Sequence, residues 1–349
     1  LGRQLYAGAW EGIKSDKFTI YYRSENEHAA KDLMKQLTEY GTIAEKNTGG
    51  ELKRSYFVVD DFGVVVNGYA DPMLSDSIHT FVFPPQNSEL SLSENWYRTV
   101  GIHEYTHMLH LKRRDKIPKV LTMLYGNMFQ PNIWSPPFMI EGITVFTESD
   151  FSKYSGRLND GYYDAYAMAR LNDNMDIDIC DATFEHEEYP YGNFYLYGGL
   201  FFRYLSQKYG KDKFDKLFEL QGSSAASYLS PFVPAAGIDR QVKKVYGKSL
   251  PKLWKEWVDF EKERAKSYKR EGSRIAEIGE RVDGLAVNSG YLYYVRSYHN
   301  MVSADQSHTK YGIYRRALSD LTKEELVFDM YREFIRISFS VKIQFTLQL

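Results

Sequence analysis

The chain has 349 residues, of which 43% are hydrophobic and 16% aromatic, and its formal net charge is −2. This composition supplies a large buried core, and the length suits two domains. Neither the charge nor any Lys/Arg block indicates binding to nucleic acid or to an anionic membrane surface, and the single cysteine, Cys180, excludes an internal disulfide framework.

The first part of the chain alternates between strand and helix patterns. Lys17–Arg23, Ser55–Asp60 and Ser77–Phe83 are rich in β-branched and aromatic residues, which is typical of strands. Between the first two, Glu25–Asn47 carries apolar residues at helical spacing. We therefore expect residues 1–90 to form an N-terminal α/β subdomain.

Helical patterns dominate residues 91–272. Ser93 is the predicted N-cap of a helix that runs through GIHEYTHMLHL, residues 101–111. Further helices are predicted at Phe138–Glu148, Tyr195–Tyr209, Lys211–Leu220 and Leu250–Tyr268. We expect this stretch to be a helical subdomain.

A polar linker, Lys269–Ser273, separates these helices from a C-terminal segment with strand patterns and turn residues. Tyr291–Arg296 and Tyr311–Arg315 are predicted to be neighbouring strands of one sheet. Residues 273–349 are therefore expected to be β-rich. The alternation in residues 328–349 lacks turn punctuation and gives no prediction of its structure or role.

The sequence HEYTH at residues 103–107 places His103 and His107 four residues apart. On a helix, these two side chains lie on one face and can bind one ion, with Glu104 beside the open side of that ion. The pattern is typical of zinc sites in which the two histidines are ligands and the glutamate is the general base. The alternative is a helix that contains two histidines by chance.

Catalytic zinc needs three protein ligands and an open fourth position. A metzincin would have glycine at position 110 and histidine at 113, and His110 and Arg113 exclude that class. Glu141 follows in the apolar stretch WSPPFMIEGITVFTES, where an acid is costly unless it is paired or bound to a cation. Glu141 is therefore the predicted third ligand.

HEYTH followed by EGITVFTE resembles the gluzincin metallopeptidases, especially the aminopeptidase/leukotriene-hydrolase branch. The resemblance is closer to bacterial peptidase MA-like proteins, in which this domain precedes a β-propeller of TolB/WD40-like repeats. GRLNDGYYDAY at 156–166 and YLYGGLFFRYLSQKYG at 195–210 fit that pattern, and the similarity covers roughly residues 15–270. It implies an α+β, thermolysin-like catalytic domain with an N-terminal mixed sheet, a mainly helical part and a C-terminal partial propeller.

The resemblance also implies a role for each matching residue. Glu104 would be the general base, and one zinc ion would be bound by His103, His107 and Glu141. Glu148 matches a second acid on the same helix and would accept a hydrogen bond from a ligand histidine. The alternative for Glu148 is a solvated surface acid.

Tyr195 is the predicted hydrogen-bond donor to the oxyanion of the reaction. In the relatives a tyrosine at the start of a helix precedes a glycine by three residues, as Tyr195 precedes Gly198 here. Tyr197 is the alternative donor, and either tyrosine could instead be an ordinary buried aromatic residue. His110 is not expected to be a ligand; it is either a packed histidine or one that supports a ligand residue.

These features predict a zinc metallopeptidase that acts on a peptide or protein substrate. An endopeptidase is favoured, because Asn67–Met73 occupies the region of the amine-anchoring G-x-M-E-N segment of aminopeptidases without matching it. The substrate could pair with Ser77–Phe83 if that strand is an edge strand; an internal strand is an equal alternative. The competing function is a non-catalytic polypeptide- or glycan-binding surface protein with a structural zinc domain.

The chain shows no apolar run long enough to cross a membrane. Its first residues, LGRQLYAGAW, have neither an initiator methionine nor the apolar region of a signal peptide, as in a mature or trimmed chain. Together with the many tyrosines, this favours an exported protein that is periplasmic, secreted or on the cell surface.

Overall fold

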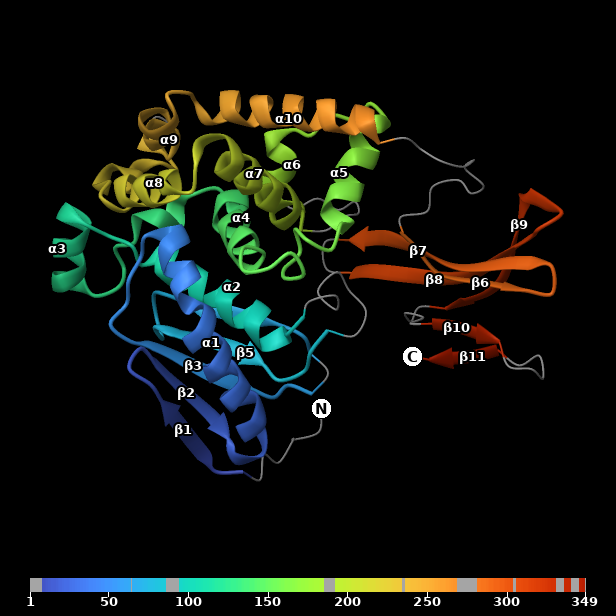
Figure 1. Cartoon of the computed structure of the whole chain (residues 1–349), viewed down its shortest axis with the longest axis horizontal. Helices are drawn as coiled ribbons and strands as arrows, with labels where there is room; N and C mark the ends of the chain where they lie inside the picture. Colours follow the sequence, from blue (N-terminus) through green and yellow to red (C-terminus); the bar gives the residue numbers. More distant parts are fainter. Residues whose placement is uncertain are drawn as a thin grey trace. The chain divides into compact units, whose positions relative to one another are not determined.

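The computed structural model describes residues 8–63, 65–85, 94–184, 192–233, 236–268, 281–303, 306–330, 336–339 and 345–348. The chain divides into two compact units, Leu1–Glu185 with Gly192–Tyr268, and His186–Tyr191 with Lys269–Leu349. The first unit has a mixed sheet followed by helices, and the second has antiparallel sheets (Figure 1). The predicted α+β class is confirmed.

The sheet of the first unit has five strands in the order β1-β2-β3-β5-β4. They are β1 (Trp10–Lys14), β2 (Phe18–Arg23), β3 (Ser55–Asp60), β4 (Gly68–Asp71) and β5 (Ser77–Phe81). Strands β2, β3 and β5 are parallel to one another, and the two edge strands, β1 and β4, are antiparallel to their neighbours. The strand predicted at Ser77–Phe83 is therefore internal, and β4, which the sequence did not predict, forms the edge.

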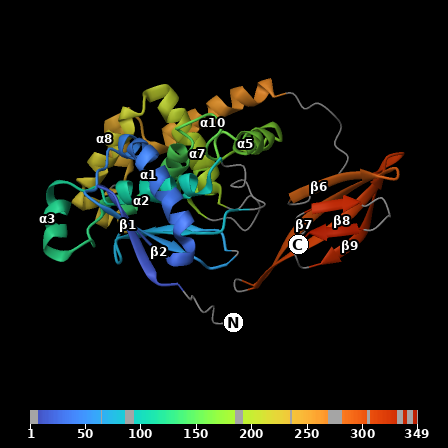
Figure 2. The ribbon, with the colours of Figure 1, turned by 60° about the horizontal axis from the view of Figure 1, so that its bottom comes forward.

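Helices α1 (Glu27–Thr48) and α2 (Trp96–Leu111) lie against one face of this sheet (Figures 1 and 2). Their shared core contains Ile20, Leu33, Phe57, Ile78 and Tyr105, all fully buried. The predicted cap Ser93 lies outside the described residues, and Asn95 caps α2 by accepting a hydrogen bond from the Arg98 N–H. Neighbouring helices and the sheet together bury α2 along nearly its whole length, which fixes the orientation of the HEYTH side chains.

The other helices of the first unit build a second layer. They are α3 (Lys116–Tyr125), α4 (Pro137–Glu148), α5 (Tyr162–Asn172), α6 (Ile179–Thr183), α7 (Asn193–Tyr209), α8 (Asp212–Gly222), α9 (Asp239–Tyr246) and α10 (Leu250–Ser267), joined in places by short 3₁₀ turns. Phe138, Phe201, Trp254 and Trp257 form the aromatic centre of their core. Helix α4 lies between α2 and α7 in Figure 1, so it can contribute side chains to the same site as α2.

Helices α4 and α7 touch through their backbones. A Cβ atom on Gly142 of α4 would lie 2.5 Å from the carbonyl carbon of Gly198 of α7, and one on Gly198 would lie 2.2 Å from the Phe138 oxygen. Real Cβ atoms do not approach so closely. The glycines of the EG and Y-x-x-G patterns therefore bring Glu141 and Tyr195 to the same region of the molecule.

The second unit contains a four-stranded antiparallel sheet in the order β6-β7-β8-β9 and a two-stranded sheet of β10 and β11. Their bounds are β6 (Arg281–Asn288), β7 (Tyr291–Ser303), β8 (Gln306–Ala317), β9 (Asp320–Met330), β10 (Arg336–Phe339) and β11 (Phe345–Gln348). Strand β7 pairs with β8, which confirms that Tyr291–Arg296 and Tyr311–Arg315 are neighbours. A propeller blade also has four strands, and the propeller stays a prediction.

The predicted domain boundaries lie partly outside the described residues. The first unit contains described residues of both predicted subdomains, 1–90 and 91–272, and the linker Lys269–Ser273 lies outside the described residues. No helix in the described part of the chain is long and apolar enough to cross a membrane.

Candidate metal centre

Three side chains from two helices converge at one point of the first unit. His103 and His107 lie one turn apart on α2, and Glu141 faces them from α4. Glu141 Oε2 lies 3.3 Å from His103 Nε2 and 3.1 Å from His107 Nε2, and one ligand atom from each residue lies within 4.8 Å of the others. The three residues that the sequence predicted as ligands are thus brought together.

The donor set fits a divalent metal ion. Glu141 Oε2 is buried and receives no hydrogen bond from the described residues. The Thr144 hydroxyl, 3.2 Å from His103 Nε2, is directed to the Glu141 carbonyl oxygen at 2.6 Å. Ligand atoms about 2.0–2.1 Å from a tetrahedral zinc are about 3.3 Å apart, close to the two distances between Glu141 and the histidines.

The electrostatic field at these residues favours positive charge. Burial lowers the pKa of His103, but the carboxylates of Glu141 and Glu148 raise it to about 9. A field that stabilises an imidazolium also attracts a divalent cation, because both carry positive charge in a site shielded from water.

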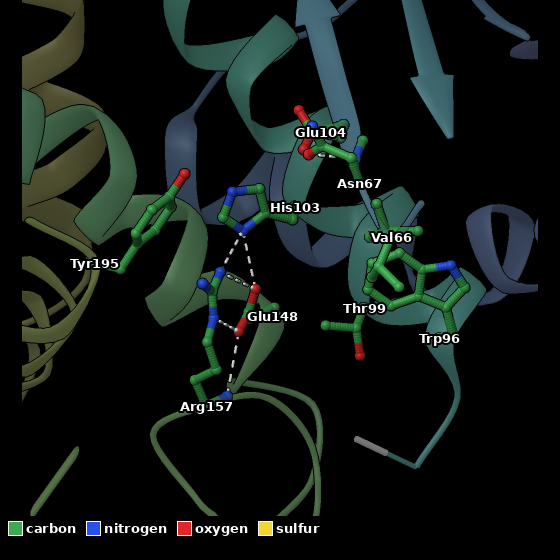
Figure 3. Close-up of a pocket in the computed structure, with 11 residues that line it drawn as sticks. Val66, Asn67, Trp96, Thr99, His103, Glu104, Glu148, Arg157 and Tyr195 are labelled. Atoms are coloured by element: carbon green, nitrogen blue, oxygen red, sulfur yellow. Dashed lines mark hydrogen bonds and ion pairs between the residues drawn. The ribbon is translucent and has the colours of Figure 1, made fainter. Parts of the chain in front are cut away.

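Glu148 and Arg157 orient the first histidine (Figure 3). A hydrogen bond of 2.9 Å joins His103 Nδ1 to Glu148 Oε2. Arg157 holds the same carboxylate with Nε at 2.8 Å from Oε1 and its terminal nitrogen at 3.0 Å from Oε2. Glu148 is fully buried, so it is not a solvated surface acid. If His103 donates through Nδ1, its Nε2 lone pair is directed towards Glu141 and His107.

Arg157 was not predicted from the sequence as a site residue. This residue lies in the turn region between α4 and α5 and is 8% exposed, with its guanidinium against the Glu148 carboxylate. Burial lowers the pKa of Arg157, but the charge of Glu148 raises it well above its usual value. The only signal in the sequence was its position in the GRLNDGYYDAY stretch, which does not reveal burial.

Glu104 lies beside the three ligand residues and lines a cavity of about 110 Å³. Val66, Asn67 and Gly68, at and before the start of β4, line the same cavity. A Cβ atom on Gly68 would lie 2.4 Å from Val100 and 3.3 Å from the Glu104 side chain, so the edge strand packs directly on α2 here. Burial raises the pKa of Glu104, and the charges of His103 and His107 oppose this.

Tyr195 also lines this cavity, whereas Tyr197 does not. The Tyr195 ring centre lies 6.1 Å from that of His103, and the Arg157 guanidinium lies 4.7 Å from the Tyr195 ring centre. Tyr197 is fully buried and its ring packs near Trp257. The geometry favours Tyr195 over Tyr197 as a group that can reach a bound substrate.

His110 is separate from the ligand set. Its ring is fully buried against Phe218, with 4.1 Å between ring centres, and neither ring nitrogen has a hydrogen-bond partner among the described residues. Burial lowers the pKa of His110 to about 3. His110 is therefore a packed, neutral histidine, which is one of the two alternatives that the sequence left open.

No protein-family model matches the chain. An uncharacterized protein of Treponema pallidum (strain Nichols) is 25% identical over 213 residues, which is 60% of this chain and 17% of that protein. The chain thus spans 17% of the length of the curated relative that it matches.

Among solved structures, the chain is weakly similar to an aminopeptidase N family protein from Idiomarina loihiensis. The TM-score is 0.41 at 8% sequence identity, and the match covers 91% of this chain and 66% of the other.

Proposed function

We propose that this protein is a zinc-dependent metallopeptidase of the gluzincin type, similar to peptidase MA-like proteins, which hydrolyses internal bonds of a peptide or protein substrate. The observation that carries the proposal is the position of Glu104. This buried carboxylate lies beside the cluster of His103, His107 and Glu141 without belonging to it, and it lines the same cavity as Tyr195. A purely structural metal site has no need for such an acid.

His103, His107 and Glu141 would hold one zinc ion. When bound, zinc would supply Lewis acidity that makes water a better nucleophile and polarises the peptide carbonyl. Glu148 and Arg157 keep the His103 ring in the orientation that this binding needs.

Glu104 would act as the general base. It would take a proton from the attacking water and later deliver that proton to the departing amine. Burial raises the pKa of this carboxyl, which makes the carboxylate a stronger base than a solvated glutamate. Tyr195 would donate a hydrogen bond to the oxyanion that develops on the substrate carbonyl.

The edge strand β4 is the place where we propose that the substrate binds. Among the described strands it pairs with β5 alone, and residues at its start line the cavity beside Glu104. An extended peptide could pair with the free edge of β4 and so pass the ligand residues. This position replaces the internal strand at Ser77–Phe81 as the candidate peptide-binding strand.

The residues that line this cavity also bear on whether the enzyme cuts internal or terminal peptide bonds. Endopeptidase activity is favoured because the segment next to the cavity, Val66–Gly68, supplies no acidic side chain to bind a free substrate amine. Export of the protein, to the periplasm, the cell surface or the medium, is also part of this proposal, and the aromatic-rich composition supports it.

The test is cleavage of a fluorescence-quenched peptide library by the zinc-loaded protein and by its Glu104→Gln variant. We expect the wild type to cut internal bonds and the variant, with the same zinc content and melting temperature, to be inactive. If neither protein cuts any peptide while both bind zinc, the alternative of a non-catalytic binding protein with a structural zinc site is correct.

A further inference from the structure

Helix α3 presents its apolar face to solvent. Ile117, Val120, Met123 and Leu124 are 62%, 56%, 81% and 68% exposed. Their spacing of three and four residues places them on one side of the helix. A surface helix of a globular protein normally turns such a stripe toward the core, so α3 has the reverse orientation.

The opposite side of α3 is attached to the first unit. Pro118 is the buried residue of the helix. The backbone N–H of Asp115, just before the helix, donates a hydrogen bond to the Gly222 carbonyl oxygen at 3.2 Å, and the Tyr228 hydroxyl donates one to the carbonyl oxygen of Met128, just after the helix, at 3.3 Å. The helix is therefore held at both ends, and its exposed face is a built feature of the fold.

Two further apolar side chains extend this face. Tyr125 ends the helix at 65% exposure, and Met128 follows it at 54%. Both views of the fold place α3 at the periphery of the first unit (Figures 1 and 2). Six exposed large apolar side chains within twelve residues exceed what single scattered surface residues explain, and such patches mark interaction sites.

Positive charge flanks the apolar face. The stretch from Lys112 to Lys119 contains five basic residues and a single acid, Asp115. Lys112 pairs with Asp76 and Arg113 with Asp215. Among the described residues, neither Lys116 nor Lys119 has a carboxylate within ion-pairing distance, and both side chains are exposed.

We propose that α3 is an interfacial anchor for a membrane surface rich in anionic lipid. Ile117, Val120, Met123 and Leu124 enter the boundary between headgroups and acyl chains, and Lys116 and Lys119 stay at the level of the lipid phosphates. Exposed apolar residues combined with lysines on one short helix are the composition that interfacial helices use. This binding is peripheral and needs no membrane-spanning segment.

The lysines favour a membrane over a second copy of the chain as the occupant of this face. In a symmetric dimer, each apolar patch would meet its own copy. The exposed face of α3 carries no carboxylate to pair with Lys116 and Lys119, whereas an anionic bilayer supplies phosphates along its whole surface. The cavity beside α3 is lined by Lys119 together with Glu51, Asp115 and Glu219, so Lys119 lies at the border between that cavity and the exposed face. The acids of the cavity assign the lipid contact to the exposed face and not to the cavity.

The net charge of the chain conceals this feature. The sequence as a whole carries −2, and the five basic residues are balanced elsewhere. The expectation from net charge, and from the lack of a Lys/Arg block, that the chain does not bind an anionic membrane surface therefore does not hold for this helix and its flanking residues.

The proposal is tested by flotation of the full chain with lipid vesicles. One set contains equal parts of phosphatidylglycerol and phosphatidylcholine, and the other contains phosphatidylcholine alone. We expect the wild type to float with the anionic vesicles and to be released by high salt. Met123→Glu should abolish flotation, and Phe232→Glu is the matched control because Phe232 is 84% exposed outside α3.

The charge contribution is measured with Lys116→Gln combined with Lys119→Gln. Each lysine near an anionic surface contributes about fivefold in affinity, so the double variant should bind the anionic vesicles roughly twentyfold to thirtyfold more weakly. Absence of wild-type flotation, or equal flotation of the Met123 and Phe232 variants, overturns the proposal. A wild-type dimer in sedimentation velocity that Met123→Glu dissociates, without vesicle binding, assigns this face to a second copy instead.

Discussion

Glu148 on α4 is fully buried and bonds to His103 on α2, with 2.9 Å between Oε2 and Nδ1. The contact joins the two helices that carry the candidate ligands, and Arg157 neutralises the carboxylate while its terminal nitrogen also lies 3.1 Å from His103 Nδ1. The orientation of one ligand histidine therefore depends on an ion pair that is itself closed to solvent.

Arg157→Met should destabilise the protein and weaken zinc binding. Breaking a buried ion pair by removing one partner typically costs about 3–5 kcal/mol, because the remaining charge is left without compensation. Loss of a group that orients a metal ligand typically lowers metal affinity by about tenfold to a hundredfold. Urea unfolding and zinc titration measure the two effects.

The control for this variant is Lys255→Met, because Lys255 pairs with Asp259 on the exposed side of α10. Surface ion pairs contribute little, so its unfolding midpoint should stay close to that of the wild type. Equal stability of the Arg157 variant and the wild type would show that Arg157 does not stabilise the buried Glu148 carboxylate.

Tyr195→Phe should lower kcat by about a hundredfold to a thousandfold, the typical effect of removing one oxyanion donor. Zinc content should stay unchanged, because only the phenolic hydroxyl is lost. Tyr197→Phe is the matched variant and should be much milder, since Tyr197 lies in the core near Trp257. The reverse ranking in steady-state kinetics would assign the role to Tyr197.

Gly198→Ala should separate α4 from α7. The added methyl group would lie 2.2 Å from the Phe138 oxygen and 3.0 Å from Gly142 Cα, and these are backbone atoms that cannot rotate away. Overpacking of this kind typically costs about 1–3 kcal/mol, and here it should also reduce zinc affinity. Gly12→Ala is the control, because its Cβ would meet Tyr21 at an ordinary 3.4 Å. Normal stability of the Gly198 variant would refute the role of this crossing.

Asp71 at the end of β4 gives a pH-dependent prediction. Burial raises its pKa, but hydrogen bonds from the backbone N–H groups of Leu74, Ser75 and Met73 and from the Ser75 hydroxyl lower it to about 2. A carboxyl with a depressed pKa in the folded state stabilises the protein above its unfolded pKa of about 3.9, and that contribution is lost as the pH falls toward 2.

Asp71→Asn should therefore be less stable than the wild type above pH 4, and the difference should shrink as the pH falls toward 2. Urea unfolding at several pH values measures this. A difference that grows at low pH would mean that Asp71 does not stabilise the turn through its charge.

Local patterns were sufficient to predict the long elements. The helix predicted at Glu25–Asn47 is α1, Glu27–Thr48, and the one predicted at Phe138–Glu148 is α4, Pro137–Glu148. The spacing of apolar residues and a proline or glycine at the helix end are properties of neighbouring residues. A single segment of the chain is therefore enough to predict such a helix.

Features that depend on distant parts of the chain were missed. Strand β4 has the sequence GYAD, which has no strand pattern. It forms because it pairs with β5 and packs against α2. The burial of Arg157 depends on Glu148, which lies on another element. The apolar spacing in α3 is the same whether the face meets a core or solvent, so only the fold reveals its exposure.

Metal analysis of the purified protein tests the central claim most directly. Zinc should be present at about one ion per chain in the wild type and in Glu104→Gln, because Glu104 lies beside the ligand cluster and not in it. His107→Ala and Glu141→Ala should both lose zinc, since each removes one of three ligands. Absence of zinc from a wild type prepared without chelator, with no rise in melting temperature when zinc is added, would contradict the account, as would equal zinc loss in all three variants.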